Sequence, residues 1–167
     1  MRTLGIDCGT AFTGYGVVEH DPDGTLRCLS CGVIKLSSKQ TLPLRLAKIF
    51  DCLNALIQGY GPDDVAIEDI FYAVNVKSAL KLGQVRGVAM LAASSAGLEV
   101  AEYAPLAIKS AVVGYGRAEK HQVQQMVARL LNLGEVPDSP DAADALAIAI
   151  CHLHTSATTR RQMAAGQ

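Results

Sequence analysis

Apolar positions along the chain change period several times, and these changes divide the chain into short strands and longer helices. Continuous or alternating apolar runs predict strands at residues 3–7, 13–20, 26–36, 64–71 and 98–104. Apolar residues spaced three or four apart predict helices at residues 42–57, 75–96, 106–113, 119–133 and 140–154. Because short turns join the first three strands and helices join the later ones, we predict an α/β fold with a five-stranded mixed sheet flanked by helices.

Length and composition favour a single domain. With 167 residues, 50% of them hydrophobic, the chain can bury a core of its own. We predict one domain over residues 1–155 and a disordered tail over 156–167, where the chain ends in TTRRQMAAGQ. The most apolar segment, VAMLAASSAGL, is far shorter than a membrane span. No signal peptide precedes the first strand, so we expect a cytoplasmic protein with no membrane partner and with its five cysteines reduced.

Charge is segregated along the chain, although the net charge is only −1. Residues 77–129 hold seven basic and three acidic side chains, a local net charge of +4. Two acidic groups of four carboxylates each lie at residues 63–69 and 135–144. Such segments are either solvated helix faces or surfaces that meet charged ligands, and the positions of the acids distinguish these possibilities.

Four acidic residues fall where the predicted fold can bring them together. Asp7 ends the first strand, within GIDCGTAFTGYG, and Glu68 lies in the fourth, DVAIEDIF. A strand that returns through a helix can lie parallel beside the first, which would bring these two carboxylates close. In SPDAADALAIAI, Asp141 and Asp144 share one face near a helix N-terminus. The apolar residues that follow require this helix to pack on the sheet, although the acids could also simply complement the helix dipole.

The chemistry of these four side chains points to divalent cations. Carboxylates without histidine or cysteine are hard oxygen ligands, which suit magnesium or manganese better than zinc. Two such ions about 4 Å apart can activate a water and stabilise the leaving oxygen of a phosphoryl displacement. We therefore expect two Mg²⁺ ions, with Mn²⁺ able to substitute, and hydrolysis of a phosphate ester. The expected metal-binding and catalytic residues are Asp7, Glu68, Asp141 and Asp144.

Five blocks of sequence together resemble a known family. They are GIDCGTAFTGYGV, AIEDIF, NVKSALKLGQVRG, VVGYGRAEKHQVQQMV and DAADALAIAI, and they span the chain from Leu4 to about His154. In this order they resemble the RuvC family of Holliday-junction resolvases. The resemblance implies an RNase H-like fold and a homodimer that makes paired, symmetric nicks in four-way junction DNA, in recombination and repair. It also implies a branch-migration complex, RuvA and RuvB, as a partner.

The resemblance also assigns roles to single residues. The four carboxylates fall on the family's acidic positions. Phe71 matches an aromatic residue that contacts bases at the opened centre of the junction, and a ring beside a metal site can stack on an unpaired base. Lys109 and Lys120 match basic positions near the scissile phosphate. From spacing alone, these two residues would be ordinary surface lysines.

Further residues of the +4 segment become candidates once the substrate is expected to be DNA. We expect Lys77, Arg86 and Arg117 to contact phosphates, because each neutralised phosphate strengthens binding and steepens its salt dependence. Gly83 and Gly87 lie one turn apart on the predicted helix at 75–96, where they let another backbone approach closely. This helix resembles the family's dimer helix.

Two positions depart from the family's pattern. Cys8 stands where proline is common, and Val74 stands where a basic residue is common. Neither departure removes a catalytic group. The Val74 departure does put a DNA contact from that position in doubt.

Three other interpretations remain open at the level of the residues. The GID-x-G opening also occurs in actin-like ATPases and sugar kinases, although those proteins need two such domains around a cleft. Another RNase H-like nuclease, for instance one that processes ribosomal RNA precursors, would lack the DAADALAIAI block and the long dimer helix. A junction-binding module without activity would be favoured by a missing carboxylate, and none of the four is missing.

Overall fold

The computed structural model describes residues 1–69 and 75–165, whose strands and helices follow one another in the predicted order. The strands are β1 (Arg2–Asp7), β2 (Phe12–His20), β3 (Leu26–Lys35), β4 (Asp64–Glu68) and β5 (Glu99–Tyr103). The helices are α1 (Leu42–Tyr60), α2 (Val76–Ser95), α3 (Pro105–Val113), α4 (Lys120–Leu130) and α5 (Pro140–Ala165). The prediction of an α/β fold with one five-stranded mixed sheet is confirmed.

The sheet has the strand order β3-β2-β1-β4-β5. The first three strands form an antiparallel meander, while β4 pairs in parallel with β1 and β5 pairs in parallel with β4. A parallel pair needs a crossover connection, and α1 and α2 supply the two crossovers. The carboxyl ends of β1, β4 and β5 therefore lie at the same edge of the sheet, as the sequence analysis predicted for β1 and β4.

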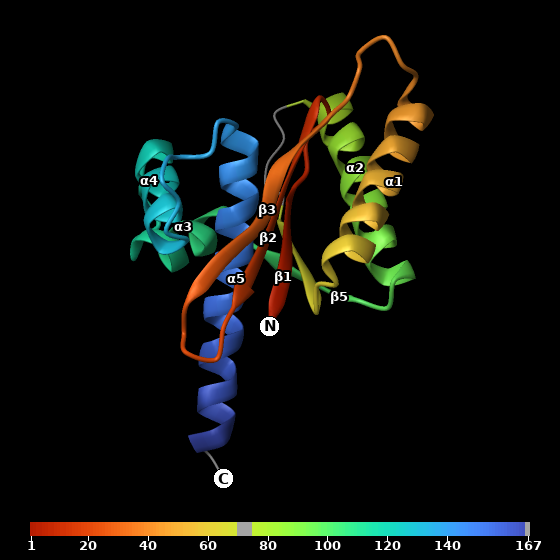
Figure 1. Cartoon of the computed structure of the whole chain (residues 1–167). Coiled ribbons are helices and arrows are strands. Elements are labelled where there is room, and N and C mark those ends of the chain that lie inside the picture. Colours follow the sequence, from red (N-terminus) through yellow and green to blue (C-terminus); the bar gives the residue numbers. More distant parts are fainter. Residues whose placement is uncertain (70–74, 166–167) are drawn as a thin grey trace.

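Helices cover both faces of the sheet, with α1 and α2 on one face and α3, α4 and α5 on the other (Figure 1). Side chains of a strand alternate between its faces, and β1 follows this rule strictly. Leu4 and Ile6 belong to the core under α1 and α2. Gly5 instead lies against the backbone of α5, so Asp7, two residues further on, is directed to the α5 side as well.

The same alternation sets the faces of β4. Val65 and Ile67 belong to the core under α1 and α2, whereas Ala66 belongs to the core that α5 covers. Asp64 and Glu68, each two residues from Ala66, share its face. On the side of α5, β1 and β4 thus have small residues in the middle and polar residues at both ends.

Helix α5 is longer than the sequence predicts, because it continues to Ala165 instead of ending near His154. Residues 155–165 contain no glycine or proline, so nothing local ends the helix there. Threonine hydroxyls also bond back to the carbonyls one turn earlier, from Thr155 to Cys151 at 2.8 Å and from Thr158 to His154 at 2.9 Å. Despite this length, no helix in the described residues is both long and apolar enough to cross a membrane.

Candidate active site

Asp7 and Glu68 end two neighbouring parallel strands. The register of β1 and β4 pairs Ile6 with Ile67, and Asp7 and Glu68 follow directly after this pair. Both side chains are half-buried and face α5. The predicted parallel pairing thus places the two carboxylates beside one another at one edge of the sheet.

The first turns of α5 supply Asp141 and Asp144, and glycines bring these turns onto the sheet. A Cβ at Gly14 on β2 would lie 2.0 Å from the Asp141 carbonyl oxygen, and one at Gly5 would lie 2.1 Å from the Ala145 carbonyl oxygen. Side chains at these positions would push the helix away. Gly14 is also the register partner of Asp7, so the helix terminus lies directly over the end of β1. Both glycines lie within predicted strands, but their role in seating α5 was missed, although glycine within a strand could have signalled it.

The four acidic side chains, Asp7, Glu68, Asp141 and Asp144, form one electrostatic unit, hereafter the carboxylate cluster. Burial and the negative charges of the other three members together raise the pKa of Asp7 from 3.8 to about 7, with burial as the largest cause. Asp144 is the strongest of the three charged neighbours. A carboxyl group that titrates near neutral pH amid three like charges is typical of a functional site rather than of a stabilising surface cluster.

Glu68 lines a cleft of about 160 Å³ that α3, α4 and α5 border. Burial and the Asp144 carboxylate raise the pKa of Glu68, while Lys109, Lys120 and Arg86 oppose this rise. Lys109 and Lys120 line the cleft together with Glu68 and Asp144. The two lysines that the resemblance placed near a scissile phosphate thus lie beside the acids.

Lys120 neutralises part of the carboxylate cluster directly. Its Nζ donates a hydrogen bond of 2.7 Å to Asp144 Oδ2, which raises the pKa of Lys120. Lys109 is held differently, because its Nζ donates to the Ala118 carbonyl oxygen at 3.0 Å. One lysine is therefore bound to an acid of the cluster, and the other is held by a backbone carbonyl at the same cleft.

Comparison with known proteins identifies the family. A model of the family described as "Crossover junction endodeoxyribonuclease RuvC" matches residues 3–152. The chain belongs to the RuvC family. Proteins named crossover junction endodeoxyribonuclease RuvC from Koribacter versatilis and Acidobacterium capsulatum are 63% and 56% identical to it, covering 98% and 97% of this chain and 99% and 98% of their own.

Solved structures agree with this RuvC assignment. A structure of Thermus thermophilus RuvC superposes with a TM-score of 0.89 at 34% identity, covering 95% of this chain and 97% of that one. T. thermophilus RuvC in complex with a Holliday junction substrate superposes with a TM-score of 0.87 at 31% identity, covering 95% and 96%. The yeast mitochondrial Holliday junction resolvase Ydc2 shares the fold, with a TM-score of 0.70 at 16% identity and coverage of 96% and 80%. The fold is RNase H-like, as expected, and the actin-like ATPase and kinase interpretations are excluded.

The four carboxylates of the cluster are chemically suited to bind divalent cations. Carboxylate oxygens are the ligands that magnesium and manganese prefer, and four mutually repelling anions require a counter-charge. As they stand, however, no three or more histidine, cysteine or acidic side chains of the described residues converge closely enough to hold one ion. Lys120 engages one oxygen of Asp144. Ligation of an ion by the whole cluster would therefore require carboxylate rotation and release of Asp144 from Lys120.

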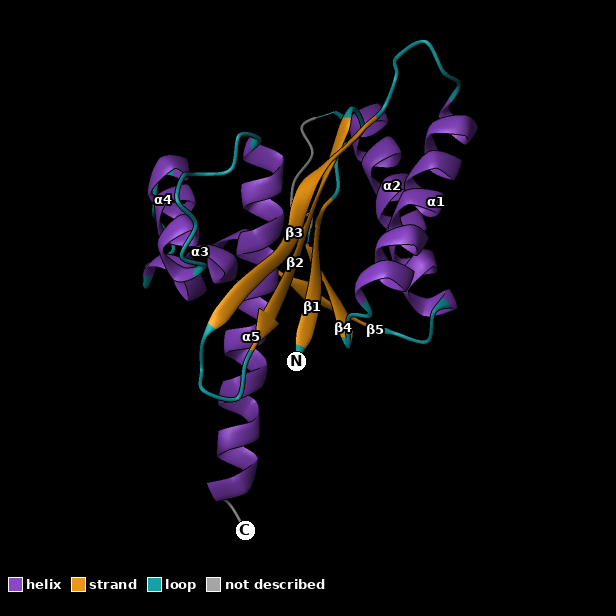
Figure 2. Cartoon of the chain, in the orientation of Figure 1, coloured by secondary structure: helices purple, strands orange, loops and turns teal. Residues whose placement is uncertain are grey.

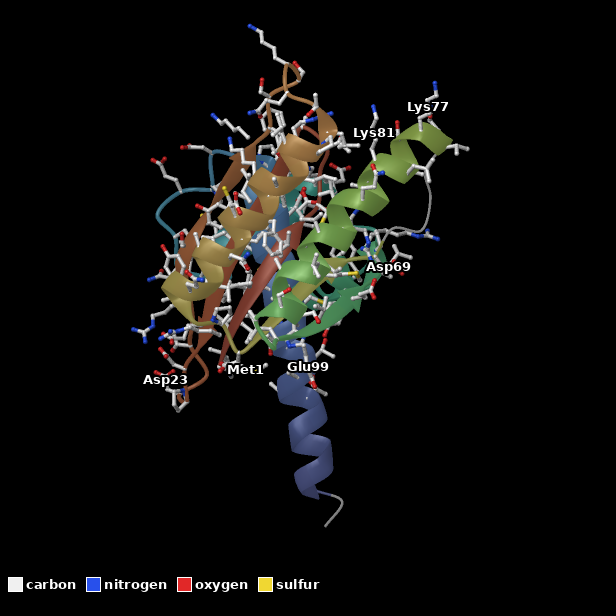
Figure 3. The ribbon with its side chains drawn as sticks, turned by 90° about the vertical axis from the view of Figure 1, so that its right-hand side faces the viewer. Met1, Asp23, Asp69, Lys77, Lys81 and Glu99 are labelled. Carbon is white, nitrogen blue, oxygen red and sulfur yellow. The ribbon has the colours of Figure 1, made fainter. Side chains whose placement is uncertain are left out.

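Several predicted RuvC site residues lie away from the carboxylate cluster. Phe71 and Val74 fall outside the described residues. Lys77 is exposed near the start of α2, where Figure 3 shows it projecting from the helix together with Lys81. Arg117 is exposed in the connection between α3 and α4.

The sequence led us to expect that Arg86 contacts phosphates from an exposed surface. The structure instead buries this residue. It is only 9% exposed, and its guanidinium group bonds to the Glu68 carbonyl oxygen and to the Glu102 carboxylate. An arginine within the +4 segment looks like a phosphate contact from sequence alone, because the strand ends that bind it are distant in the chain. The buried placement argues against a phosphate contact.

Gly83 and Gly87 lie on the exposed side of α2, as a contact helix requires. A Cβ at either glycine would meet no other atom within 4 Å. The same side of α2 carries exposed apolar side chains at Val76, Leu80 and Leu91, which are 74%, 64% and 56% exposed. Successive members of the set Val76, Leu80, Gly83, Gly87 and Leu91 are three or four residues apart, so they form one stripe along the helix.

Proposed function

We propose that this protein is a structure-selective endodeoxyribonuclease that resolves Holliday junctions by paired, symmetric nicks, in recombination and DNA repair. The observation that carries the proposal is the carboxylate cluster, two members of which, Glu68 and Asp144, line one cleft together with Lys109 and Lys120. Membership of the RuvC family supports the substrate, because a relative, T. thermophilus RuvC, has been solved in complex with a Holliday junction. All four acids that phosphodiester hydrolysis would use are present in this chain.

The carboxylate cluster would hold two divalent cations, with Mg²⁺ as the proposed metal and Mn²⁺ as a substitute. Asp7 and Asp141 would contribute to both sites, Glu68 to one and Asp144 to the other. When bound, such ions lower the pKa of a coordinated water and stabilise charge on the leaving oxygen. The protein holds the acids on rigid elements, at the ends of two strands and in the first turns of a packed helix, so the site needs little rearrangement of the backbone.

The lysines of the cleft have separate tasks in this proposal. Lys120 balances the charge of Asp144 and becomes available to a phosphate when Asp144 binds a cation. Lys109, held by the Ala118 carbonyl oxygen, directs a fixed positive charge into the same cleft. Positive groups so placed stabilise the negative charge that builds up during phosphoryl transfer.

Contacts to the junction outside the cleft remain proposals drawn from sequence. Phe71 would stack on an unpaired base at the junction centre, and Lys77 and Arg117 would contact phosphates. Replacement Phe71→Ala is expected to weaken cleavage while the fold stays intact. Unchanged cleavage rates on junctions would contradict the stacking role.

A second copy of this chain would dock on the exposed face of α2. Symmetric nicking of two opposed strands requires two equivalent sites, which a two-fold symmetric homodimer supplies. The stripe of Gly83, Gly87 and exposed apolar side chains on α2 is suited to close helix packing. Sedimentation equilibrium would measure the dimer, and Leu80→Glu is expected to weaken it.

The cellular setting follows from the same proposal. An enzyme of this activity would act in the cytoplasm on chromosomal junctions. The branch-migration complex of RuvA and RuvB is the proposed partner. Co-purification of this protein with a preformed complex of the two on junction DNA would test the association.

A nicking assay tests the activity most directly. A synthetic four-way junction and a linear duplex of the same sequence are incubated with the protein and magnesium, manganese or a chelator. We expect paired nicks on the junction alone, with either metal and not with the chelator. Binding without cutting under any metal would identify a junction-recognition protein instead, and cutting of RNA or linear DNA without junction preference would favour a different nuclease specificity.

A further inference from the structure

Arg86 is the only charged residue among the described ones that is buried, with 9% of its surface exposed. Removing a guanidinium group from water is costly unless its charge and its donors find partners. Arg86 finds these partners on two other elements, because Nη1 donates to the Glu68 carbonyl oxygen and Nη2 donates to the Glu102 carboxylate. The Asp69 carboxylate lies 3.6 Å from Nη2. One side chain of α2 therefore joins the carboxyl ends of β4 and β5.

The bond to Glu68 fixes the backbone at the point where β4 delivers its carboxylate. Glu68 is the last residue of β4, and Asp69 N donates to the Tyr103 carbonyl oxygen at 2.8 Å. The peptide group between Glu68 and Asp69 is thus held on both sides, by Arg86 at its oxygen and by β5 at its nitrogen. Figure 3 shows Asp69 close beside α2. Without these two bonds, the backbone that carries the Glu68 carboxylate would be held less firmly.

We propose that Arg86 is a positioning residue for the nuclease: it fixes the Glu68 backbone so that the Glu68 carboxylate is preorganised for metal, and it ties α2 to the carboxylate cluster. The inference rests on the proposed nuclease function and deepens it. Because Gly87, next to Arg86, lies on the exposed face of α2 where a second copy would dock, this side chain links the docking helix to a metal ligand. The link is a single buried group, so it can be removed by one substitution.

The experiment compares three variants at this link with a control at a more exposed arginine that also pairs with two acids. Arg86→Met keeps the apolar stem and removes the donors, Arg86→Lys keeps the charge, and Glu102→Gln weakens the pair while leaving Arg86 in place. The control is Arg27→Met on β3, since Arg27 also pairs with two carboxylates, Asp21 at 2.6 Å and Glu19 at 3.5 Å. Arg27 lies at the other end of the sheet, beside the β2–β3 turn.

Four quantities are measured for each protein: the single-turnover cleavage rate, the affinity for Mn²⁺ without DNA, the junction affinity in a chelator as a function of salt, and the melting temperature. For Arg86→Met we expect the cleavage rate and the Mn²⁺ affinity each to fall by about tenfold to a hundredfold, as for other groups that orient metal ligands. Arg86→Lys should recover little, because an ammonium group cannot reproduce the two-pronged contact. Glu102→Gln should show a smaller loss in the same direction. Junction affinity and its salt slope should stay unchanged.

Other outcomes would overturn the proposal. A loss of junction affinity with a salt slope shallower by about one would identify Arg86 as a phosphate contact. A lower melting temperature with unchanged Mn²⁺ affinity and cleavage rate, in Arg86→Lys and Glu102→Gln as well, would leave only a structural role. If the unaltered protein neither cuts junctions nor binds Mn²⁺, the proposed function itself fails, which the wild-type measurement distinguishes from failure of the Arg86 proposal.

Discussion

Two polar clusters lie at opposite ends of the same three elements, β1, β4 and α5. One end holds the carboxylate cluster. The other end holds the basal cluster, composed of Thr3 on β1, Asp64 on β4 and His152 on α5. Tyr103 reaches His152 from the end of β5 that lies beside Glu68. The register pairs Thr3 with Asp64 at one end and leads to Asp7 beside Glu68 at the other. The scaffold is shared, so the difference between the ends lies in their side chains.

The basal cluster is satisfied internally. Thr3 Oγ1 donates to Asp64 Oδ1 at 2.6 Å, and His152 Nε2 lies 3.0 Å from Asp64 Oδ2. Tyr103 contacts the other ring nitrogen of His152 at 2.8 Å, and their rings meet edge to face. One acid is thus surrounded by donors, and such a closed network stabilises the packing of α5 on the sheet.

The carboxylate cluster has the opposite balance of donors and acceptors. Of its four acids, Asp144 bonds to Lys120, and the pKa of Asp7 rises to about 7 as a result of burial and repulsion. Folding therefore tolerates an unfavourable set of charges at this end. The same sheet and helix can thus be stabilised by hydrogen bonds at one end and keep an excess of negative charge, suited to binding cations, at the other.

The largest effect is expected from Asp7→Asn. Cleavage should fall at least about a thousandfold, because metal-assisted charge stabilisation contributes several kcal/mol to the rate. Junction binding should remain, since the carboxylate does not contact phosphate without a cation. Single-turnover nicking and a junction-binding titration measure the two quantities. Cleavage at the wild-type rate would show that the carboxylate cluster is not the active site.

The same variant should gain stability where the wild type loses it. The pKa of Asp7 is raised from 3.8 to about 7 in the folded protein, so the folded state binds a proton more tightly than the unfolded chain between these pH values. Wild-type stability should thus decrease as pH rises from about 4 to about 7, and this contribution should vanish in Asp7→Asn. Thermal melts at pH 4 and pH 8 check the prediction. A melting temperature of Asp7→Asn at or below that of the wild type at pH 8 would contradict it.

The next largest effect is expected from Gly14→Ala. The added Cβ would meet the Asp141 carbonyl oxygen at 2.0 Å, so the start of α5 must shift. A displacement near 1 Å at a reacting site can cost about a hundredfold in rate. Cleavage and melting temperature should both fall. The control is Gly59→Ala in α1, where a Cβ meets nothing within 4 Å and helix propensity should rise instead.

A smaller loss is expected from Lys120→Met. This change removes the partner of Asp144 and one positive charge of the cleft. We expect the cleavage rate to fall about tenfold to a hundredfold, because the cleft loses a positive group that would stabilise the charge built up during phosphoryl transfer. Stability should change little, because the Lys120 side chain is 58% exposed. A large drop in melting temperature with normal cleavage would assign Lys120 to folding instead.

The smallest effect on cleavage is expected from His152→Phe in the basal cluster. Phenylalanine keeps an aromatic ring at this position, but Asp64 and Tyr103 lose a hydrogen-bond partner. This loss should lower the free energy of unfolding by about 1–3 kcal/mol. Cleavage well below the melting temperature should stay within about twofold, because Asp64, which His152 contacts, lies at the opposite end of β4 from Glu68. Denaturant unfolding and the nicking assay measure these changes. A strong loss of cleavage would show that the two ends are coupled through α5.

The sequence predicted the parts of the site that depend on local pattern. Strand and helix periods placed Asp7 and Glu68 on neighbouring strands, and the spacing of Asp141 and Asp144 placed both on one helix face. The rule that a crossover strand can lie parallel beside its predecessor was enough to join these pieces. The family resemblance then supplied Lys109 and Lys120, which spacing alone would have left as surface lysines.

What the sequence did not predict depends on contacts between distant residues. The role of Gly14 follows from a helix more than a hundred residues later, and the burial of Arg86 follows from the ends of two strands that it bonds. Local patterns carry no record of such partners. The length of α5 beyond His154 is a different case, because residues 155–165 contain no glycine or proline that would end the helix.

The order of the site residues along the chain has a consequence for protein synthesis. Asp7 leaves the ribosome early, whereas Asp141 and Asp144 belong to the last helix. A nascent or truncated chain without α5 lacks half of the carboxylate cluster and leaves the face of β1 and β4 without its covering helix. On the proposed mechanism, a translation product that stops before α5 therefore cannot cut DNA, because it lacks Asp141 and Asp144.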